Sequence, residues 1–339
     1  MKKSVLLIGI IAWVAVILAA ILIMGGVLRG GFFLPDNSKL LKEEETDLFG
    51  ISDILIETDS LDIEFVVGQG PRLKVRQYGA EKTTAEELFS LSQKDGVLRI
   101  GVKNPVRIFS VNFGLNERLT LEIPAEWLGN VSLQNSSGNI SLADAFTWQN
   151  VSLSSYSGDL RVTGELCAEE ISLHITSGNV VARQGLTATK LNISTTSGDI
   201  RLNGILRART FNAKTVSGNI VIEQAEAERY DLHASSGDIR AKLSGGGAAS
   251  ATSGNINLSL TAPLGDVELD TSSGDISLSV EQDISFDFSG LCSSGDIYAN
   301  FPLQKNERGN RAAGSVGHDP SASIRAEAAS GNIRIERAE

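Results

Sequence analysis

Residues 197–202 read Ser-Gly-Asp-Ile-Arg-Leu, and the motif Ser-Gly-(Asp/Asn)-(Ile/Leu/Val) that opens this stretch occurs ten times in the chain. The motif glycines are Gly138, Gly158, Gly178, Gly198, Gly218, Gly237, Gly254, Gly274, Gly295 and Gly331. The first five are 20 residues apart, and the later gaps are 19, 17, 20, 21 and 36 residues. Such spacing predicts a solenoid, in which each repeat buries its apolar face only by stacking on its neighbours.

The residues around each motif alternate between apolar and polar. Ile200 and Leu202 follow Gly198 at two and four positions, and Leu191 and Ile193 precede it with Asn192 between them. A period of two is that of a strand with one buried face, and glycine supplies the positive φ of a tight corner. We therefore predict an all-β fold, a parallel β-solenoid of about ten 20-residue coils over residues 129–339.

The residue after each glycine also follows a rule. Asn and Asp alternate through the first eight copies, which keeps carboxylates of neighbouring coils, ~4.8 Å apart, from stacking on one another. The eight residues are Asn139, Asp159, Asn179, Asp199, Asn219, Asp238, Asn255 and Asp275. Three of these aspartates precede an arginine by two residues, which predicts the ion pairs Asp159–Arg161, Asp199–Arg201 and Asp238–Arg240.

Asp275 and Asp296 break the alternation, because they are the corner residues of consecutive motifs. We expect them to be adjacent in the stack. They form the one candidate metal site of the sequence, although a structural corner is the favoured interpretation. No cofactor is expected. Cys167 and Cys292 lie about six coils apart, on the order of 30 Å, which exceeds the ~7 Å disulfide limit and predicts two free thiols.

An outward-facing row of small polar residues is the candidate binding face. It could hold a repetitive polymer, or it could simply be a solvated sheet surface. Trp148 could add an aromatic platform, alone or with Trp127, although packing at the start of the solenoid is favoured for both. The row consists of Ser132, Ser152, Ser172, Asn192 and Asn212.

The repeats are flanked by less regular segments. Residues 51–128 read as an irregular β cap, in which Ser60-Leu61-Asp62-Ile63 resembles a corner with leucine in place of glycine and residues 81–89 could form a short helix. Residues 302–322 are expected to be a polar loop insertion, after which Ile333–Ile335 closes the stack.

The amino-terminal residues predict a membrane anchor. An uninterrupted apolar run extends from Val5 to Met24, long enough to span a bilayer and longer than the 7–15 residues of a cleaved signal peptide. Lys2 and Lys3 precede it, which favours a cytoplasmic amino terminus. We expect a cytoplasmic stub and single transmembrane helix at 1–28, a juxtamembrane linker at 29–50, and an extracytoplasmic solenoid.

Composition limits the function. A net charge of -11 argues against nucleic acid as a partner, because phosphate backbones require clustered Lys and Arg. Aromatic residues make up only 6% of the chain, and the corner aspartates stand two coils apart beside arginines, which does not resemble the paired carboxylates of a glycoside hydrolase. We therefore expect a protein that is not an enzyme.

Three segments carry a resemblance to a known family. The run Leu119-Thr-Leu-Glu-Ile-Pro124, the recurring Ser-Ser-Gly-Asp-Ile, and Gly314-Ser-Val-Gly317 followed by Ser330-Gly-Asn-Ile333 are similar to the bacterial "putative adhesin" family of β-strand-repeat proteins, over roughly residues 50–337. The resemblance implies a β-repeat fold and surface interaction, with some relatives linked to envelope-stress regulation.

Four functions are compatible with these features. The first is a binding module for a cell-wall polymer or surface. The second is a protein-interaction partner in an envelope-stress regulatory system. The third is a scaffold that polymerises by coil stacking, and the fourth, the least favoured, is a carbohydrate-active enzyme. The oligomeric state is left open.

Overall fold

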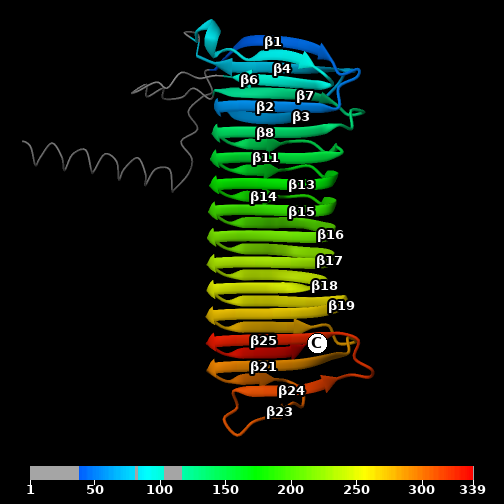
Figure 1. The fold of residues 1–339 in the computed structure, drawn as a ribbon, viewed down its shortest axis with the longest axis vertical. Coiled ribbons are helices and arrows are strands. Elements are labelled where there is room, and N and C mark those ends of the chain that lie inside the picture. The colour runs from blue at the N-terminus through cyan, green and yellow to red at the C-terminus, as the bar shows by residue number, and fades with distance from the viewer. Residues whose placement is uncertain (1–37, 81–82, 103–116, 339) are drawn as a thin grey trace, which may run out of the picture.

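The computed structural model describes residues 38–80, 83–102 and 117–338. In this part of the chain the strands form one continuous sheet that winds into a long stack of coils (Figure 1). The predicted all-β, largely parallel fold is therefore confirmed. No helix within the described residues is long and apolar enough to cross a membrane, and the anchor predicted at 1–28 lies outside them.

Strands that lead into the corners stack in register and form what we call the pre-corner sheet. Pairing within it is parallel and places equivalent residues of successive coils side by side, for example Leu153 beside Leu173. Its strands are β2 (Asp53–Ser60), β8 (Asn130–Ser137), β11 (Asn150–Ser157), β13 (Leu166–Ser177), β15 (Leu186–Ser197), β16 (Ile200–Ser217), β17 (Ile220–Ser236), β18 (Ile239–Ser253), β19 (Ile256–Ser273), β21 (Phe286–Ser294) and β25 (Ser323–Ser330).

Strands that leave the corners stack in the same way and form the post-corner sheet. The separate strands here are β3 (Asp62–Gly68), β9 (Ile140–Leu142), β12 (Leu160–Val162), β14 (Val180–Ala182), β20 (Ile276–Val280), β22 (Ile297–Ala299) and β26 (Ile333–Arg337). From β16 to β19 the post-corner segment continues without a break into the next pre-corner segment. The two-residue β10 (Phe146–Thr147) pairs with β13 in the connection between them.

Every corner glycine has a positive φ, as the motif requires. At Gly198 φ is 150°, and a Cβ atom there would lie 2.0 Å from the carbonyl oxygen of Gly178 in the preceding coil. The corner therefore needs glycine for two reasons, backbone conformation and close stacking.

The core lies between the two sheets and consists of aliphatic columns. Ile200, Leu202, Leu191 and Ile193 are at most 1% exposed, and each is flanked by its equivalents in the neighbouring coils. Burying one such side chain contributes about 1.5–3 kcal/mol, so the repeated columns stabilise a chain that has few large aromatic residues.

The two terminal coils enter the stack out of sequence order. β2 lies between β8 and β6 (Val97–Val102), and β3 lies between β9 and β7 (Arg118–Pro124). At the other end β25 lies between β19 and β21, and β26 between β20 and β22. In Figure 1 the blue β2 and the red β25 each lie within the stack rather than at its end. Residues 51–128 do lie at the amino-terminal end of the stack, as predicted for a cap, but β2 and β3 within them form a regular coil. The prediction that Ile333–Ile335 closes the stack is wrong, because β26 lies between β20 and β22.

This spatial order completes the alternation of Asp and Asn. Each Asn of the ladder donates both its backbone N–H and its side-chain amide to the Oδ1 of the Asp on one side. Its own Oδ1 accepts the backbone N–H of the Asp on the other side. For Asn179 these distances are 2.9 and 3.1 Å to Asp159 and 2.9 Å from the N–H of Asp199. The ladder runs Asp62, Asn139, Asp159, Asn179, Asp199, Asn219, Asp238, Asn255, Asp275, Asn332 and Asp296.

Asn332 lies between Asp275 and Asp296 in the ladder. The prediction that these two aspartates are adjacent and form a candidate metal site is therefore wrong. Asp275 Oδ1 accepts the backbone N–H of Asn332, and Asn332 Oδ1 accepts that of Asp296. Two of the three predicted corner ion pairs are present, Arg161–Asp159 at 2.6 Å and Arg201–Asp199 at 2.5 Å. Arg240 forms no such pair within the described part of the chain.

Antiparallel strands close the sheets at their ends. At the amino-terminal end β1 (Lys39–Asp47) pairs with β4 (Arg72–Gly79), β4 pairs with β7, and β5 (Ser90–Lys94) pairs with β6. At the other end β24 (Arg311–Val316) pairs with β21 and with β23 (Gln304–Lys305). Such strands cover the open edges that would otherwise pair with another chain.

These closing strands correct three expectations from the sequence. Residues 39–47 of the expected linker form a strand, because Glu43 and Glu45 face Arg76 and Lys74 across the β1–β4 pair, at 2.6 and 2.8 Å. The expected loop at 302–322 contains the β23–β24 hairpin, which buries Ala312 and Val316. The helix expected near 81–89 is only the 3₁₀ turn η1 (Ala85–Glu87), and residues 81–82 are not described.

Candidate binding face

The predicted polar row lies on the outer face of the pre-corner sheet. Register places Ser132 beside Ser152, Ser152 beside Ser172, Ser172 beside Asn192, and Asn192 beside Asn212. All five are at least partly accessible. Because strands in a sheet are ~4.8 Å apart, the row presents a polar group at each such interval along the stack.

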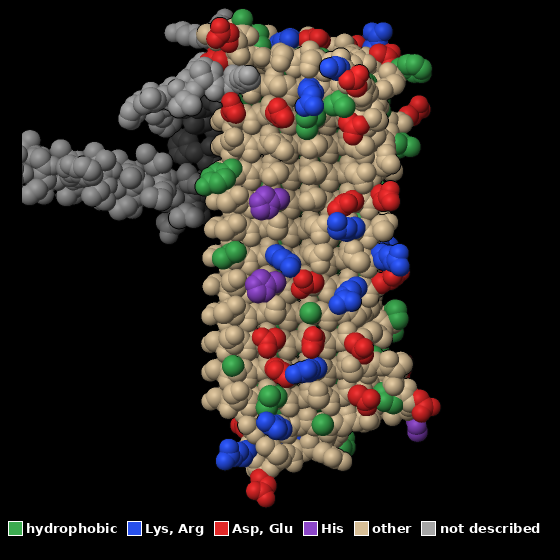
Figure 2. Space-filling view, viewed as in Figure 1, with side chains coloured by type: hydrophobic (Ala, Val, Ile, Leu, Met, Phe, Trp, Pro, Cys, Tyr) green, Lys and Arg blue, Asp and Glu red, His purple; other side chains and the backbone are tan. Residues whose placement is uncertain are grey.

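The row is neutral until it reaches Asp231. Asn212 Nδ2 donates to Asn192 Oδ1 at 2.8 Å, and the next position is Asp231, which pairs with Lys214 at 3.1 Å. In Figure 2, which shows this side of the molecule, few charged side chains lie on the stretch directly below the amino-terminal end. The neutral part of the row, from Ser132 to Asn212, thus extends over about five coils.

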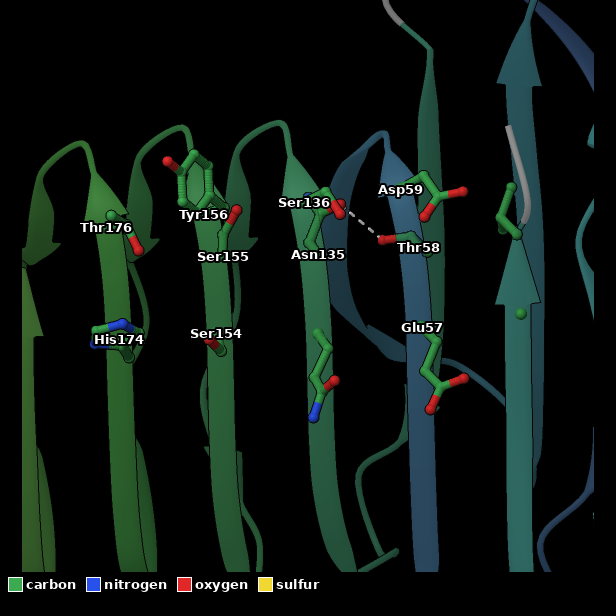
Figure 3. A pocket seen from close by; sticks show the side chains of 13 residues that line it. Glu57, Thr58, Asp59, Asn135, Ser136, Ser154, Ser155, Tyr156, His174 and Thr176 are labelled. Atoms are coloured by element: carbon green, nitrogen blue, oxygen red, sulfur yellow. Dashed lines mark hydrogen bonds between the residues drawn. The ribbon is translucent and has the colours of Figure 1, made fainter. Parts of the chain in front are cut away.

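A shallow groove of about 470 Å³ runs beside the row on the same strands. It crosses β6, β2, β8, β11 and β13 on the side nearest the corners (Figure 3). Its lining residues are Glu57, Thr58, Asp59, Gly101, Val102, Gln134, Asn135, Ser136, Ser154, Ser155, Tyr156, His174 and Thr176.

Period-two alternation explains how these side chains reach the groove. Glu57, Ser154 and His174 occupy one row across the strands, and Asp59 and Tyr156 lie in the next row towards the corners (Figure 3). Small serines between the longer side chains leave the hollow. Thr58 Oγ1 donates to Asn135 Oδ1 at 2.9 Å beneath it, so the floor is held by a buried polar contact.

The groove combines an exposed aromatic ring with hydrogen-bonding groups. Tyr156 is 68% exposed, although a large apolar surface is normally buried. His174 Nδ1 lies 2.8 Å from Ser194 Oγ, which orients the ring. Carboxylates, amides and hydroxyls around a tyrosine ring are suited to hydroxyl-rich ligands, because the ring contacts apolar faces and the polar groups bind hydroxyls.

Trp148 does not belong to this face. It is 3% exposed, its ring stacks on Phe146 with centroids 4.5 Å apart, and it meets Phe65 of β3 edge-on at 5.8 Å. Trp127 is half-buried and donates its indole N–H to the carbonyl of Ile51 at 3.0 Å. Both tryptophans therefore pack at the start of the solenoid, and the sequence missed Tyr156, whose only signal was an aromatic residue at an outward position.

The remaining predicted residues show no metal-binding geometry. Cys167 and Cys292 are both free, and burial raises the pKa of the Cys292 thiol. No group of three or more His, Cys, Asp or Glu side chains that could hold a metal ion occurs within residues 38–80, 83–102 and 117–338.

Taken together, the repeats and the closed ends define an all-β solenoid with a long exposed sheet. The family model described as Toastrack DUF4097 matches residues 51–244 and 168–336. The chain therefore belongs to this family, as the resemblance of its repeats to β-repeat putative adhesins implied. No match is found among curated proteins.

Crystal structures of several bacterial proteins are similar over most of their length. A putative adhesin from Bacteroides fragilis is 15% identical, with 88% of this chain and 97% of that chain covered and a TM-score of 0.36. A putative adhesin from Parabacteroides merdae is 14% identical, with 90% and 98% covered and a TM-score of 0.38. A putative lipid binding protein from Parabacteroides distasonis is 14% identical, with 88% and 96% covered and a TM-score of 0.39.

Proposed function

We propose that the protein is a non-enzymatic binding module that holds a neutral, hydroxyl-rich polymer of the cell envelope against its pre-corner sheet. The observation that carries the proposal is the groove around Tyr156, which adjoins the neutral row from Ser132 to Asn212. In this proposal residues 1–28 anchor the protein in the membrane, and the solenoid lies outside the cytoplasm.

The geometry supports a polymer rather than a small molecule. The groove is shallow and crosses five strands, and the row continues beyond it on the same face. A ligand with a regular repeat can contact equivalent side chains on successive coils, and many weak contacts on one chain give high overall affinity.

Co-sedimentation of the full chain, purified in detergent, with cell-wall material from the source organism tests the proposal. Saturable binding is expected, and Tyr156→Ala should weaken it roughly two- to tenfold, since an aromatic contact contributes about 0.5–1.5 kcal/mol. Tyr298→Ala is the matched control, because Tyr298 is an exposed tyrosine of the post-corner sheet.

Two results would contradict the proposal. One is the absence of saturable binding, which would favour a protein partner in the envelope, to be sought by cross-linking in intact membranes. The other is an equal loss of binding in the Tyr156 and Tyr298 variants, which would place the contact outside the groove.

A further inference from the structure

The post-corner sheet contains a second hollow, on strands β17, β18, β19, β20 and β26, with a volume of about 570 Å³. We call it the trough. Its polar lining residues are Glu223, Arg240, Lys242, Asn257, Ser259, Ser277, Ser279, Arg334 and Glu336. Three cationic side chains thus border one hollow on a chain whose net charge is -11.

A change in the repeat pattern forms the trough. Along the outward column of this sheet, arginine and valine alternate from Arg161 to Arg240, and then Asn257 and Ser277 follow. The small side chains form a floor two strands wide. Arg240 and Lys242 border it on one side and Arg334 on the other, about 14 Å away for three strand spacings.

The cations of the two sides differ in their partners. Arg334 pairs with Glu336 at 3.1 Å. Arg240 and Lys242 have no ion pair or side-chain hydrogen bond within the described part of the chain, whereas Arg161 and Arg201 of the same column pair with their corner aspartates. Glu223 is the one unpaired carboxylate that lines the hollow. The side formed by Arg240 and Lys242 is therefore the one available to an anion.

Donors on the adjacent strand complete this side. Asn257 is the register partner of Arg240, and Ser259 that of Lys242. An oxyanion on β18 and β19 would thus meet a guanidinium, an ammonium, an amide and a hydroxyl. Arginine binds carboxylates and phosphates with two parallel hydrogen bonds, and the remaining floor, formed by Ser277 and Ser279, can accept and donate to sugar hydroxyls.

From this arrangement we propose that the trough binds the oxyanion of an acidic glycan, a uronate carboxylate or a phosphodiester, between Arg240 and Lys242. The site lies on the opposite sheet from the Tyr156 groove and does not depend on it.

Binding of the full chain to oligogalacturonate, to inorganic polyphosphate and to neutral dextran tests this site. Oligogalacturonate, polyphosphate or both should bind the wild-type chain. R240Q/K242Q should weaken the binding of these acidic polymers at least tenfold and should leave the binding of dextran unchanged. The double variant R207Q/R209Q removes the same charge from exposed positions elsewhere, where each arginine pairs with a glutamate, and should change binding less than twofold.

A third variant tests the shape of the site. Ser277→Trp keeps every cation and fills the floor, so it should also weaken binding, while melting curves show that each variant is folded. Equal losses of acidic-polymer binding in R240Q/K242Q and R207Q/R209Q would show that binding depends only on the net charge of the chain, and would overturn the proposal. Failure of the wild-type chain to bind either acidic polymer would also overturn it. Binding of one acidic polymer alone would identify the oxyanion as carboxylate or phosphate.

Discussion

At the scale of single residues, two positions of each coil determine the geometry of the corner and the hydrogen bonds between neighbouring coils. The corner glycine permits both the positive φ and the close approach of the next coil. The residue after it joins the coils through a chain of hydrogen bonds in which each carboxylate lies between amides. Hydrogen bonds to charged groups contribute about 1.5–3 kcal/mol each, so the ladder is a substantial part of the stacking energy.

Replacing Gly198 with valine should destabilise the protein by at least ~1–2 kcal/mol, because a β-branched residue is strained at positive φ and its Cβ would overlap the Gly178 carbonyl. Thermal melting measures the change. The control is Gly70→Val, since a Cβ at Gly70 meets nothing within 4 Å. An unchanged melting curve for the Gly198 variant would contradict the corner geometry.

Replacing Asn179 with aspartate should cost about 1–3 kcal/mol, because it removes the amide donor to Asp159 and aligns three carboxylates along the ladder. Urea unfolding measures the loss. Asn203→Asp, at an exposed site with no ladder neighbour, should be nearly neutral. If the two variants were equally stable, the alternation of Asp and Asn at the corners would not contribute to the stability of the stack.

At the scale of strands, the sequence predicts which side chains face inward but not which strand lies beside which. Period-two alternation correctly placed the core columns and the row from Ser132 to Asn212. It could not identify β1, because that strand is specified by charges facing Arg76 and Lys74 on a strand distant in sequence. Trp148 was ambiguous because nothing local shows whether an aromatic residue near a coil junction packs inward.

One contact between strands should respond to pH. Asp266 of β19 accepts hydrogen bonds from the backbone N–H and Oγ of Ser323 at the start of β25, both at 2.8 Å, and these bonds lower the Asp266 pKa. A lowered carboxyl pKa stabilises the folded state above the group's ordinary value, 3.8, and that contribution is lost as the pH falls through the lowered pKa.

Ser323→Ala should therefore move the Asp266 pKa part of the way back towards 3.8, since the backbone donor remains. Titration of the carboxyl carbon by NMR measures it, and Ser289→Ala on the neighbouring strand β21 is the control. An Asp266 that titrates at its ordinary value in the wild-type chain would exclude this contact.

At the scale of the whole molecule, both candidate sites depend on the coils that enter the stack out of order. The Tyr156 groove needs β2 between β6 and β8, and the trough needs β26 beside β20. The hydrophobic pattern of every coil is nearly the same, so it cannot specify the order of the coils. The one sequence signal was the alternation rule itself, which requires an Asn between Asp275 and Asp296, and Asn332 supplies it.

Disulfide formation between introduced cysteines tests this order most directly. In a chain carrying C167A and C292A, the pair Glu268→Cys and Arg325→Cys occupies register partners on β19 and β25, whereas Glu268→Cys and Ser289→Cys lie on strands separated by β25. Adjacent strands, ~4.8 Å apart, meet the distance limit for a disulfide, and strands two spacings apart exceed it. We predict that mild oxidation joins the 268–325 pair and not the 268–289 pair. The reverse result would mean that β21 lies directly beside β19, so that the last coils stack in sequence order, and it would contradict the order of coils on which the trough depends.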